Sequence, residues 1–326
     1  MKYLRYRLLR LIPVFFLVTF ASFALLNILP GDAADAILGG ADGTMDNPES
    51  IVEVRNELRK ELGLDRPIII RYFSWLGGVL QGDFGESYVQ IAPVWELLME
   101  RLPVTIELLI LAQTLALLIA LPFGVYSALR ADKTVDRLIS TVTFGIVAMP
   151  PFLMAILLVF VFAVAWQMLP ASGYFPIDEG LGKNLYHYIL PATVIGLLEA
   201  PVLLRVLRVD LIATLQEDYI ALAKAKGMST GYILFRHALR PSSFTLVTVL
   251  GLQFGFLISG TVIIEQIFSL PGMGKLILDA IDNRDSMLLQ GGVTLIAIAY
   301  VAINLVVDML YAVLDPRVGH NARARS

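Results

Sequence analysis

Long apolar runs separated by short polar connections form the main pattern of this sequence. Six of these runs have the roughly 20 residues or more that a helix needs to cross a bilayer. They lie at about Leu9–Leu29, Val104–Ala128, Leu138–Ala165, Tyr188–Leu207, Phe244–Ile267 and Leu288–Leu314. The pattern predicts an all-α polytopic membrane protein with six transmembrane helices.

Prolines interrupt two of the predicted helices. Pro150 and Pro151 fall within the third, and Pro191 and Pro201 fall within the fourth. A proline at membrane depth is tolerated where a neighbouring helix or a cavity satisfies the carbonyl groups that it frees. Two interpretations stay open: these helices line a transport pathway, or their prolines only kink ordinary helix packing.

The composition agrees with a membrane protein and excludes some chemistry. Of the 326 residues, 57% are hydrophobic and 16% are charged, against roughly 25% charged in soluble domains. The absence of cysteine excludes disulfides, thiolate metal sites and cysteine nucleophiles. The basic N-terminal flank resembles that of a signal peptide. The apolar run after it is too long for one and lacks a small-residue cleavage site, so we expect a retained first helix.

The positions of Lys and Arg predict the orientation, because cytoplasmic connections are enriched in both. Basic residues gather before the first run, between the second and third, between the fourth and fifth, and after the sixth. They are Lys2, Arg5, Arg7, Arg10, Arg130, Lys133, Arg137, Arg205, Arg208, Lys224, Lys226, Arg236, Arg240, Arg317, Arg323 and Arg325. The alternate connections hold fewer, with Lys183 in one and Lys275 and Arg284 in another. Both termini are therefore predicted to be cytoplasmic.

The long connection after the first helix falls on the outer side. The segment Pro30–Arg101 carries 13 acidic and 6 basic residues. Its spacing predicts helices at Glu49–Leu62 and Arg66–Leu80, a turn at Gly82–Ser87, and a stretch along the membrane surface at Ile91–Leu102. The segment is either a solvated linker or a small external subdomain, and its length of about 70 residues favours the subdomain.

A polar, basic helix–turn–helix is predicted at Thr214–Pro241, between two apolar runs. Acidic residues suit the start of its first helix and lysines suit the last turn. These residues are Glu217, Asp218, Lys224 and Lys226. Gly227 follows where a helix usually stops, and Ser229 is placed to cap a second short helix, with Pro241 closing it. The hairpin lies on the cytoplasmic side in the predicted orientation.

No motif of an enzyme stands in the sequence. The three histidines, His187, His237 and His320, are scattered, and HExxH, GxSxG and the phosphate-binding GxxxxGK[ST] loop are all absent. We therefore expect this chain to have no catalytic residue, no metal site and no bound cofactor of its own.

Few ionisable residues lie inside the predicted helices. Glu199 lies near the middle of the fourth, Asp308 in the inner third of the sixth, and Glu265 at the outer end of the fifth. Such groups are costly in hydrocarbon and should face protein or water. Glu199 either contacts an amine-bearing substrate or pairs two helices, whereas a structural role is favoured for Asp308. The pathway candidates are Glu199, Gln253 and Glu265.

The stretch DYIALAKAKG from Asp218, followed by FRHALRP from Phe235, resembles the cytoplasmic EAA-type loop of inner-membrane permease subunits in binding-protein-dependent ABC importers. Essentially the whole chain resembles the dipeptide/oligopeptide/nickel permease group, in the first of its two permease types. Supporting stretches are GDFGES, LPVTIELL, GTVIIEQIFSLPGMGKL, NRD and NLVVDMLYAVLDPRV. They supply the motif residues Gly82, Asp83, Gly85, Ser87, Pro271, Gly272, Gly274, Asp308, Asp315, Pro316 and Arg317.

The loop departs from the general pattern of these importers. Ala221, Leu222 and Ala223 stand where Glu-Ala-Ala is expected, His237 replaces the usual isoleucine, and Pro241 comes one place late. The peptide-permease branch resembles this sequence in those respects.

The resemblance implies that the short helix docks in a cleft of a separate ATPase subunit and is carried along when the ATPase dimer closes on ATP. Ala221, Ala223 and Ala225 are small and then allow close approach. Tyr219, Ile220 and Leu222 offer apolar contact, and Lys224 and Lys226 offer charge at the rim of the cleft. Gly227 permits the sharp reversal that follows. The implied coupling residues are Asp218, Tyr219, Ala221, Ala223, Lys224, Gly227, His237 and Pro241.

The resemblance also implies a prokaryotic inner membrane and several partners. These are a second permease subunit in a heterodimer, two ATP-binding subunits that hold ATP and Mg²⁺, an external binding protein and the lipid bilayer, but no nucleic acid. The chain then divides into a transmembrane helix at 1–30, an external segment at 31–102, a core of five transmembrane helices at 103–314 and a cytoplasmic tail at 315–326. The expected cargo is a peptide, with a nickel chelate as the alternative. An ion-coupled secondary transporter is the alternative from another class.

Overall fold

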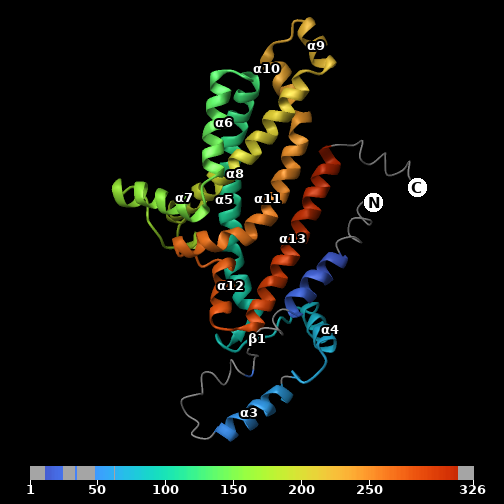
Figure 1. The fold of residues 1–326 in the computed structure, drawn as a ribbon, viewed down its shortest axis with the longest axis vertical. Helices are drawn as coiled ribbons and strands as arrows, with labels where there is room; N and C mark the ends of the chain where they lie inside the picture. The colour runs from blue at the N-terminus through green and yellow to red at the C-terminus, as the bar shows by residue number, and fades with distance from the viewer. Residues whose placement is uncertain (1–11, 25–33, 35–47, 62, 315–326) are drawn as a thin grey trace, which may run out of the picture. The chain divides into compact units, whose positions relative to one another are not determined.

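A computed structural model of the chain describes residues 12–24, 34, 48–61 and 63–314. The chain divides into two compact units. Unit 1 contains Ile106–Leu270 and the end of the last helix, and unit 2 contains the earlier residues together with Pro271–Val301. Figure 1 shows that helices dominate throughout the described residues. The structure therefore confirms the predicted all-α class.

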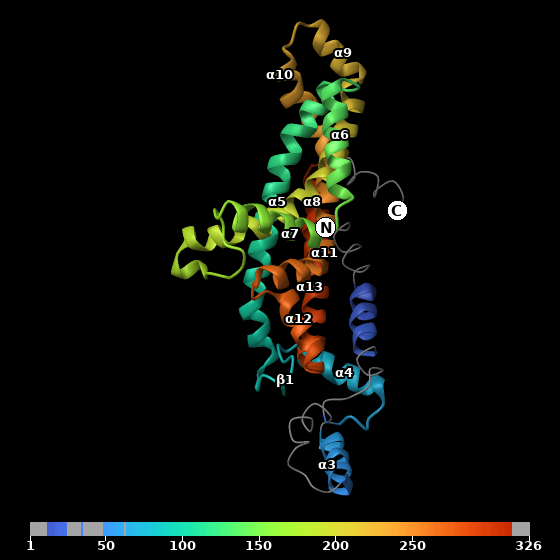
Figure 2. The ribbon, with the colours of Figure 1, turned by 60° about the vertical axis from the view of Figure 1, so that its left-hand side comes forward.

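Unit 1 is built from long helices joined by short turns. Its elements are the C-terminal part of α5 (Val94–Leu129), α6 (Thr134–Val147), α7 (Pro151–Leu158), the π-helix η1 (Val159–Ala165), η2 (Ile177–Glu179), α8 (Leu181–Leu215), α9 (Asp218–Ala225), α10 (Thr230–Ile233), the π-helix η3 (Leu234–Ala238) and α11 (Leu239–Phe268). Helices α6, α7 and α11 all pack against α8. Figures 1 and 2 show α9 and α10 at the end of this bundle, beyond α6 and α8.

Small residues allow α5 and α8 to approach each other closely. A Cβ added to Gly196 of α8 would lie 3.0 Å from the carbonyl oxygen of Ala112 on α5. Further along, Ala116 and Ala120 of α5 are fully buried in one apolar cluster with Leu203 of α8. Small residues are common between helices in membranes, because they let the backbones approach closely. Van der Waals packing then stabilises the helix pair in place of the hydrophobic effect.

The prolines of the third and fourth predicted helices behave differently. The chain bends by 103° between α6 and α7, with Pro150 just before α7 and Pro151 as its first residue. In contrast, Pro191 and Pro201 lie buried inside α8, which continues through both. The prediction that prolines break the third helix is confirmed. The fourth is unbroken, because neighbouring helices pack around both of its prolines.

Unit 2 holds shorter elements and the start of two long helices. They are a helix at Ile12–Ala24, α3 (Pro48–Glu61), α4 (Ile68–Val79), the paired two-residue strands β1 (Glu86–Ser87) and β2 (Ala92–Pro93), the first turns of α5, α12 (Met273–Asp282) and most of α13 (Ser286–Leu314). The strands form an antiparallel hairpin. The helix at Ile12–Ala24 packs against α4, where the hydroxyls of Thr19 and Tyr72 are 2.8 Å apart.

Two of the elements predicted after the first helix are confirmed, and one is wrong. The helices expected at Glu49–Leu62 and Arg66–Leu80 correspond to α3 and α4. The separate surface stretch expected at Ile91–Leu102 is absent, because α5 begins at Val94 and continues for 36 residues. The sequence left open whether Val94 and Leu98 face lipid or the helix bundle, and both are fully buried in the core of unit 2.

Three described helices are long and apolar enough to cross a membrane, namely Val94–Leu129, Leu181–Leu215 and Ser286–Val306. The number rises to five if each of two bent helix pairs counts as one span. One pair is the bend at Pro150, and the other is the end of α11 taken together with α12. The apolar helix at Ile12–Ala24 is shorter. The chain is thus a polytopic membrane protein, and the count of six stays a prediction.

Candidate functional site

The hairpin between α8 and α11 forms through local signals in the sequence. Helix α9 has Asp218 in its first turn and Lys224 in its last. Gly227 follows with φ +75°, a conformation that residues with a Cβ resist. The amide of Gly227 donates to Lys224 O at 2.9 Å, and the amide of Met228 donates to Ala223 O at 3.2 Å, so the last carbonyls of the helix are satisfied. The predicted first helix and its stop are confirmed.

The second helix of the hairpin begins as predicted but does not end at Pro241. Ser229 caps α10, because its hydroxyl oxygen accepts from the amide of Tyr232 at 3.3 Å. The π-helix η3 follows and leads directly into α11, which begins at Leu239. Pro241 therefore lies inside a continuous helical run, three residues after the π-helix η3, and does not end it. The expectation that Pro241 closes the helix is wrong.

One face of the hairpin is buried against the ends of α5 and α8. We define the hairpin seat as the cluster of buried residues Ala128, Leu211, Ile220, Ala223, Ile233, Leu234 and Ala238. Ile220 is fully buried there, and Ala223 is 7% exposed. These two residues therefore cannot offer contact to a partner in the way that the sequence suggested. The reason is helical spacing, because positions three apart share one face of α9.

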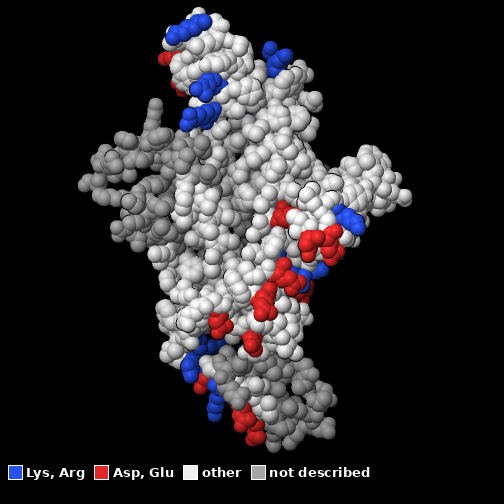
Figure 3. All heavy atoms as spheres, turned by 180° about the vertical axis from the view of Figure 1, so that it is seen from behind, with Lys and Arg blue, Asp and Glu red and all other residues white. Residues whose placement is uncertain are grey.

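The opposite face of the hairpin exposes large apolar side chains. We define the exposed face as Tyr219, Leu222, Met228, Tyr232 and Phe235, of which Leu222 is 57% and Phe235 73% exposed. Ala221, Lys224, Ala225 and Lys226 are also exposed. Basic side chains gather over this end of unit 1 (Figure 3). An exposed apolar surface with a charged rim is typical of a protein-binding site.

Two side chains at the edge of the hairpin lie between its two faces. The Tyr219 hydroxyl donates to the carbonyl of His237 at 3.5 Å. The ring of His237 packs edge-on against that of Tyr232, and its buried Nε2 has no hydrogen-bond partner among the described residues. Burial, and then the charge of Glu217, raise the pKa of Tyr219 above its usual value, so this phenol stays protonated at neutral pH.

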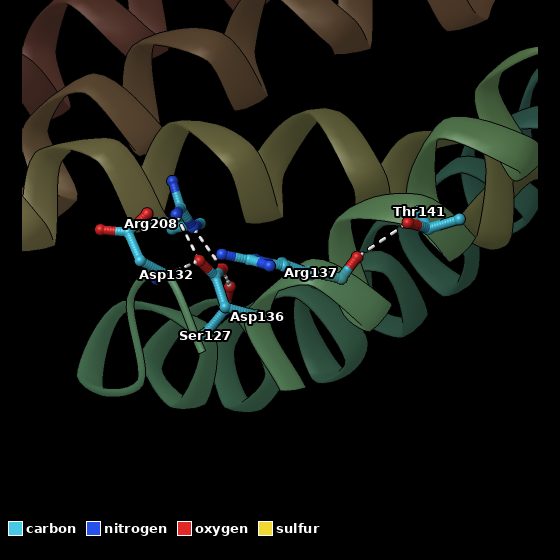
Figure 4. Close-up of polar contacts among 6 residues, drawn as sticks. All are labelled: Ser127, Asp132, Asp136, Arg137, Thr141 and Arg208. Carbon is cyan, nitrogen blue, oxygen red and sulfur yellow. Dashed lines mark hydrogen bonds and ion pairs between the residues drawn. The ribbon is translucent and has the colours of Figure 1, made fainter. Parts of the chain in front are cut away.

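A charged cluster that the sequence did not predict lies beside the hairpin seat. We define the Asp136 cluster as Ser127, Asp132, Asp136 and Arg208 (Figure 4). Arg208 donates from Nε to Oδ1 and from Nη2 to Oδ2 of Asp136, both at 2.6 Å. Ser127 donates to the same carboxylate, and the amide of Asp132 donates to Oδ2 at 2.9 Å. The only sequence signal was an acidic and a basic residue at the ends of neighbouring apolar runs.

The pathway candidates lie at different places in unit 1. Glu199 is half-buried in α8, and its Oε2 has no hydrogen-bond partner among the described residues. Gln253 of α11 has the same property at Oε1. Glu265, in the last turns of α11, is fully buried and is thus enclosed by packed side chains. Gln113 of α5 was not predicted, although it is 3% exposed and both ends of its amide lack hydrogen-bond partners within the described part of the chain.

Most of the remaining motif residues shape unit 2. Gly82 and Gly85 have φ of +87° and +85°, and Asp83 accepts from the amide of Gly85 at 2.9 Å. Ser87 is buried and donates to Asp285. Gly272 and Gly274 are buried at the start of α12, next to the partly buried Pro271. The backbone of Asp308 lies in α13, while Asp315, Pro316 and Arg317 lie outside the described residues.

Among the described residues there is no group of three or more His, Asp or Glu side chains that could hold a metal ion. The predicted absence of a metal site and of a bound cofactor stays a prediction for the whole chain.

Comparison with known proteins places the chain in a family. The family described as "Binding-protein-dependent transport system inner membrane component" matches residues 120–320. A companion family for the N-terminal part of such membrane components matches residues 1–109. The chain belongs to this permease family. Within it, the two family matches and the relatives below, which are named as peptide and glutathione permeases, together support a permease of the peptide/nickel group of binding-protein-dependent ABC importers.

Relatives of this permease extend over nearly its whole length. A probable peptide ABC transporter permease protein, y4tP, from Sinorhizobium fredii is 36% identical over 97% of this chain and 98% of the relative. The glutathione transport system permease protein GsiC from Escherichia coli strain K12 is 34% identical over 98% of this chain and 99% of the relative. GsiC from Salmonella typhimurium is 36% identical over the same shares.

A solved structure shares the fold of the permease. A chain of the MetNI methionine ABC transporter, in a structure described as inward facing, superposes with a TM-score of 0.57 at 14% identity. The match covers 67% of this chain and 96% of that chain. At this identity the likeness shows the fold alone.

Proposed function

We propose that this permease forms the translocation pathway of an ATP-driven importer of peptide-like solutes and couples to separate ATPase subunits through residues 214–241. The observation that carries the proposal is the exposed face of the hairpin. Five large apolar side chains are exposed there, although residues such as Ile220 show that the same hairpin buries apolar groups where its own chain can cover them. An exposed apolar face held on a packed support suits a docking partner.

The proposed complex contains four further protein components. A second permease subunit completes the pathway, two ATP-binding subunits hold ATP and Mg²⁺, and an external binding protein delivers the cargo. The family supports a prokaryotic inner membrane, and the distribution of Lys and Arg supports an orientation with both termini and the hairpin in the cytoplasm. The segment at 31–102 then lies outside, where it is placed to receive the binding protein.

The names of the relatives support a peptide-like cargo. Those relatives are described as peptide and glutathione permeases, and both cargoes contain amide bonds and a free amine. Competition for uptake among a dipeptide, glutathione, a longer peptide and a nickel chelate measures the preference. We expect the peptides to compete best. Stronger competition by the chelate would favour the nickel alternative.

Glu199 and Gln253 are proposed to contact cargo within the pathway, because each holds a buried oxygen without a hydrogen-bond partner among the described residues. Both oxygens are acceptors, which suits the amine or amide N–H groups of a peptide. Glu199→Gln keeps an acceptor but removes the charge that would pair with the amine of a peptide, so it should raise the KM for uptake without changing assembly. An unchanged KM in both Glu199→Gln and Gln253→Leu would show that these side chains only pair helices.

Reconstitution with the partners tests the coupling role directly. Replacing Leu222 and Phe235 together by serine removes two exposed apolar side chains without touching the hairpin seat. Binding of the ATPase should weaken about tenfold or more, since burial of one such side chain contributes roughly 1.5–3 kcal/mol. Val89→Ser is the matched control, because Val89 is 42% exposed in unit 2 and lies outside the hairpin.

Two results would contradict the proposed function. Wild-type binding of the ATPase by the double serine variant would make the hairpin a plain connector. Uptake that continues without ATPase subunits and follows an ion gradient would instead favour a secondary transporter.

The orientation is tested with single cysteines, because the chain has none of its own. Thr230 and Ser74 are both exposed in the structure. An impermeant thiol reagent added to intact cells should label Ser74→Cys and leave Thr230→Cys unlabelled until the cells are opened. Labelling of Thr230→Cys from outside would reverse the orientation and end the coupling proposal.

A further inference from the structure

The Asp136 cluster joins three segments of unit 1 through one carboxylate. Ser127 belongs to the last turn of α5, Asp136 to the first turn of α6, and Arg208 to the second half of α8. Asp136 is 3% exposed. Its carboxylate oxygens accept from the Ser127 hydroxyl, the Asp132 amide and the Arg208 guanidinium. The two parallel bonds from Arg208 fix orientation as well as distance, which a single bond does not.

The cluster is adjacent to the hairpin seat along both supporting helices. Ala128 of the seat follows Ser127 directly, and Leu211 of the seat comes one helical turn after Arg208. Leu211 and Ile220 are both fully buried in that seat, so a displacement of α9 acts on the end of α8 through packed side chains. Close-packed side chains transmit such a displacement, because they have few voids in which to absorb it.

The third segment, α6, leads away from the hairpin toward the middle of the bundle. It ends at the bend of 103° before Pro150. Beyond the bend, α7 packs against both α8 and α11. Helix α6 is therefore placed between the hairpin end of unit 1 and the bent segment at 150–165.

The α5–α6 turn is held in an uncommon conformation by the same carboxylate. Asp132 has φ +65°, a left-handed conformation that is unfavourable for a residue with a Cβ. Its amide is the group that donates to Asp136 Oδ2. The carboxylate thus sets the angle at which α6 leaves α5, as well as its attachment to α8.

From these observations we infer that Asp136 and Arg208 are positioning residues that make α6 and the bent segment after it move with α8 when the ATPase displaces the hairpin. The inference rests on the proposed coupling function and adds the route from the hairpin to the transmembrane helices. Without the pair, α8 follows the hairpin while α6 does not. ATP hydrolysis then continues, and fewer cargo molecules cross for each ATP.

The test compares Asp136→Asn with Arg137→Gln in the complete reconstituted transporter. Arg137 is the next residue and is exposed; its bonds among the described residues are backbone ones, from its amide to Lys133 O at 3.1 Å and from the Thr141 hydroxyl to its carbonyl at 2.9 Å. Both variants lose one charge at the same end of α6. The readout is the number of cargo molecules transported per ATP hydrolysed, measured on equal amounts of purified complex.

Asp136→Asn should lower this ratio by roughly 2- to 30-fold, the range in which changes along a coupled network alter the coupling between two sites. Arg137→Gln should keep the wild-type ratio. A role in stability alone would lower the yield of complex while leaving the ratio per complex unchanged, and that result would overturn the inference.

A double variant covers the case in which Asp136→Asn fails to assemble because Arg208 keeps an uncompensated charge. Asp136→Asn with Arg208→Gln removes both charges and should restore assembly but not the ratio. A cysteine pair at the same two positions, joined by a bifunctional thiol reagent, should restore the ratio, and a monofunctional reagent should not.

The outcomes separate the two proposals. If the wild-type complex shows no ATP-dependent uptake, the proposed function fails. If it does, and the double variant transports with the wild-type ratio, the route through Asp136 is wrong and the coupling role of the hairpin stands.

Discussion

The hairpin at 214–241 and the turn at Gly82–Ser87 both reverse the chain through glycines with positive φ, +75° at Gly227 and +87° at Gly82. They differ in whether the residues around the glycine are exposed or buried. Around Gly227 every residue from Lys224 to Gly231 is exposed. At the other turn, Ser87 is 1% exposed and donates to Asp285, which is 3% exposed.

The difference shows how a motif residue relates to its role. The Gly82–Ser87 turn satisfies its groups within unit 2, so its motif residues stabilise the chain itself. The hairpin exposes large apolar side chains on one side while it buries others, such as Ile220 and Ala223, in its seat, so its exposed residues are the ones proposed to meet a partner. Substitutions that affect the Gly82–Ser87 turn should therefore lower stability, whereas substitutions in the hairpin should mainly lower the cargo transported per ATP.

The largest effect on stability is expected at Asp285. The carboxylate accepts from Ser87 and from the amide of Leu288 at 3.0 Å. Asp285→Ala leaves both donors buried and unpaired, at a cost of about 3 kcal/mol or more, since hydrogen bonds to a charged group contribute about 1.5–3 kcal/mol each. The Tm, followed by tryptophan fluorescence in detergent, should fall clearly.

Asp282→Ala is the control for this comparison, because Asp282 is exposed in the last turn of α12. Its Tm should stay at the wild-type value. Equal Tm values for both variants would show that the buried turn does not support unit 2.

A smaller effect on stability, but a large one on coupling, is expected at Gly227. A Cβ there meets no atom within 4 Å, so the cost of Gly227→Val is conformational, about 1–2 kcal/mol. The chain should still assemble, but α9 changes its angle and cargo transported per ATP should fall. Reconstituted uptake and ATP hydrolysis measure both quantities.

Gly231→Val is the matched control, since Gly231 is also exposed and its added Cβ also meets no atom within 4 Å. Gly231 lies in α10 and its φ is not positive. If the two valine variants transport equally well, the left-handed turn at Gly227 has no special part in coupling.

The smallest effect is expected at the helix cap. Ser229→Ala removes the bond to the amide of Tyr232 and should weaken α10 by about 1 kcal/mol. Hydrogen exchange of the Tyr232 amide should then become about fivefold faster, because 1.4 kcal/mol corresponds to a factor of ten. Thr230→Ala keeps the cap and should exchange at the wild-type rate. A Tyr232 amide that exchanges alike in both variants would mean that the cap does not stabilise the hairpin.

Much of the hairpin was predictable because its signals are local. Asp218, Gly227 and Ser229 act on backbone groups within a few residues of themselves, so their order in the sequence is sufficient to place the helix, its stop and the next cap. The error at Pro241 has a local cause as well. Proline usually disrupts a helix, yet here the chain stays helical from α10 through Pro241, with the π-helix η3 directly before α11, and the sequence did not show this.

The side of the hairpin that faces a partner could not be predicted in the same way. Ile220 and Leu222 are both apolar and two residues apart, yet one is fully buried and the other is 57% exposed. The difference depends on where Leu211 and Ala128 lie when α5 and α8 have packed. A list of apolar residues does not contain that information.

By itself the sequence determined that this protein is a helical membrane protein, that it belongs to a permease family, and that it carries a basic hairpin between two apolar runs. Those properties follow from composition, from the length of the apolar runs and from motifs of adjacent residues. Only the tertiary structure decided that Asp136 pairs with Arg208, 72 residues away, and Ser87 with Asp285, 198 residues away. Such pairs depend on the packing of whole helices, because the partner of a buried charge is set by which faces meet and not by the residues beside it.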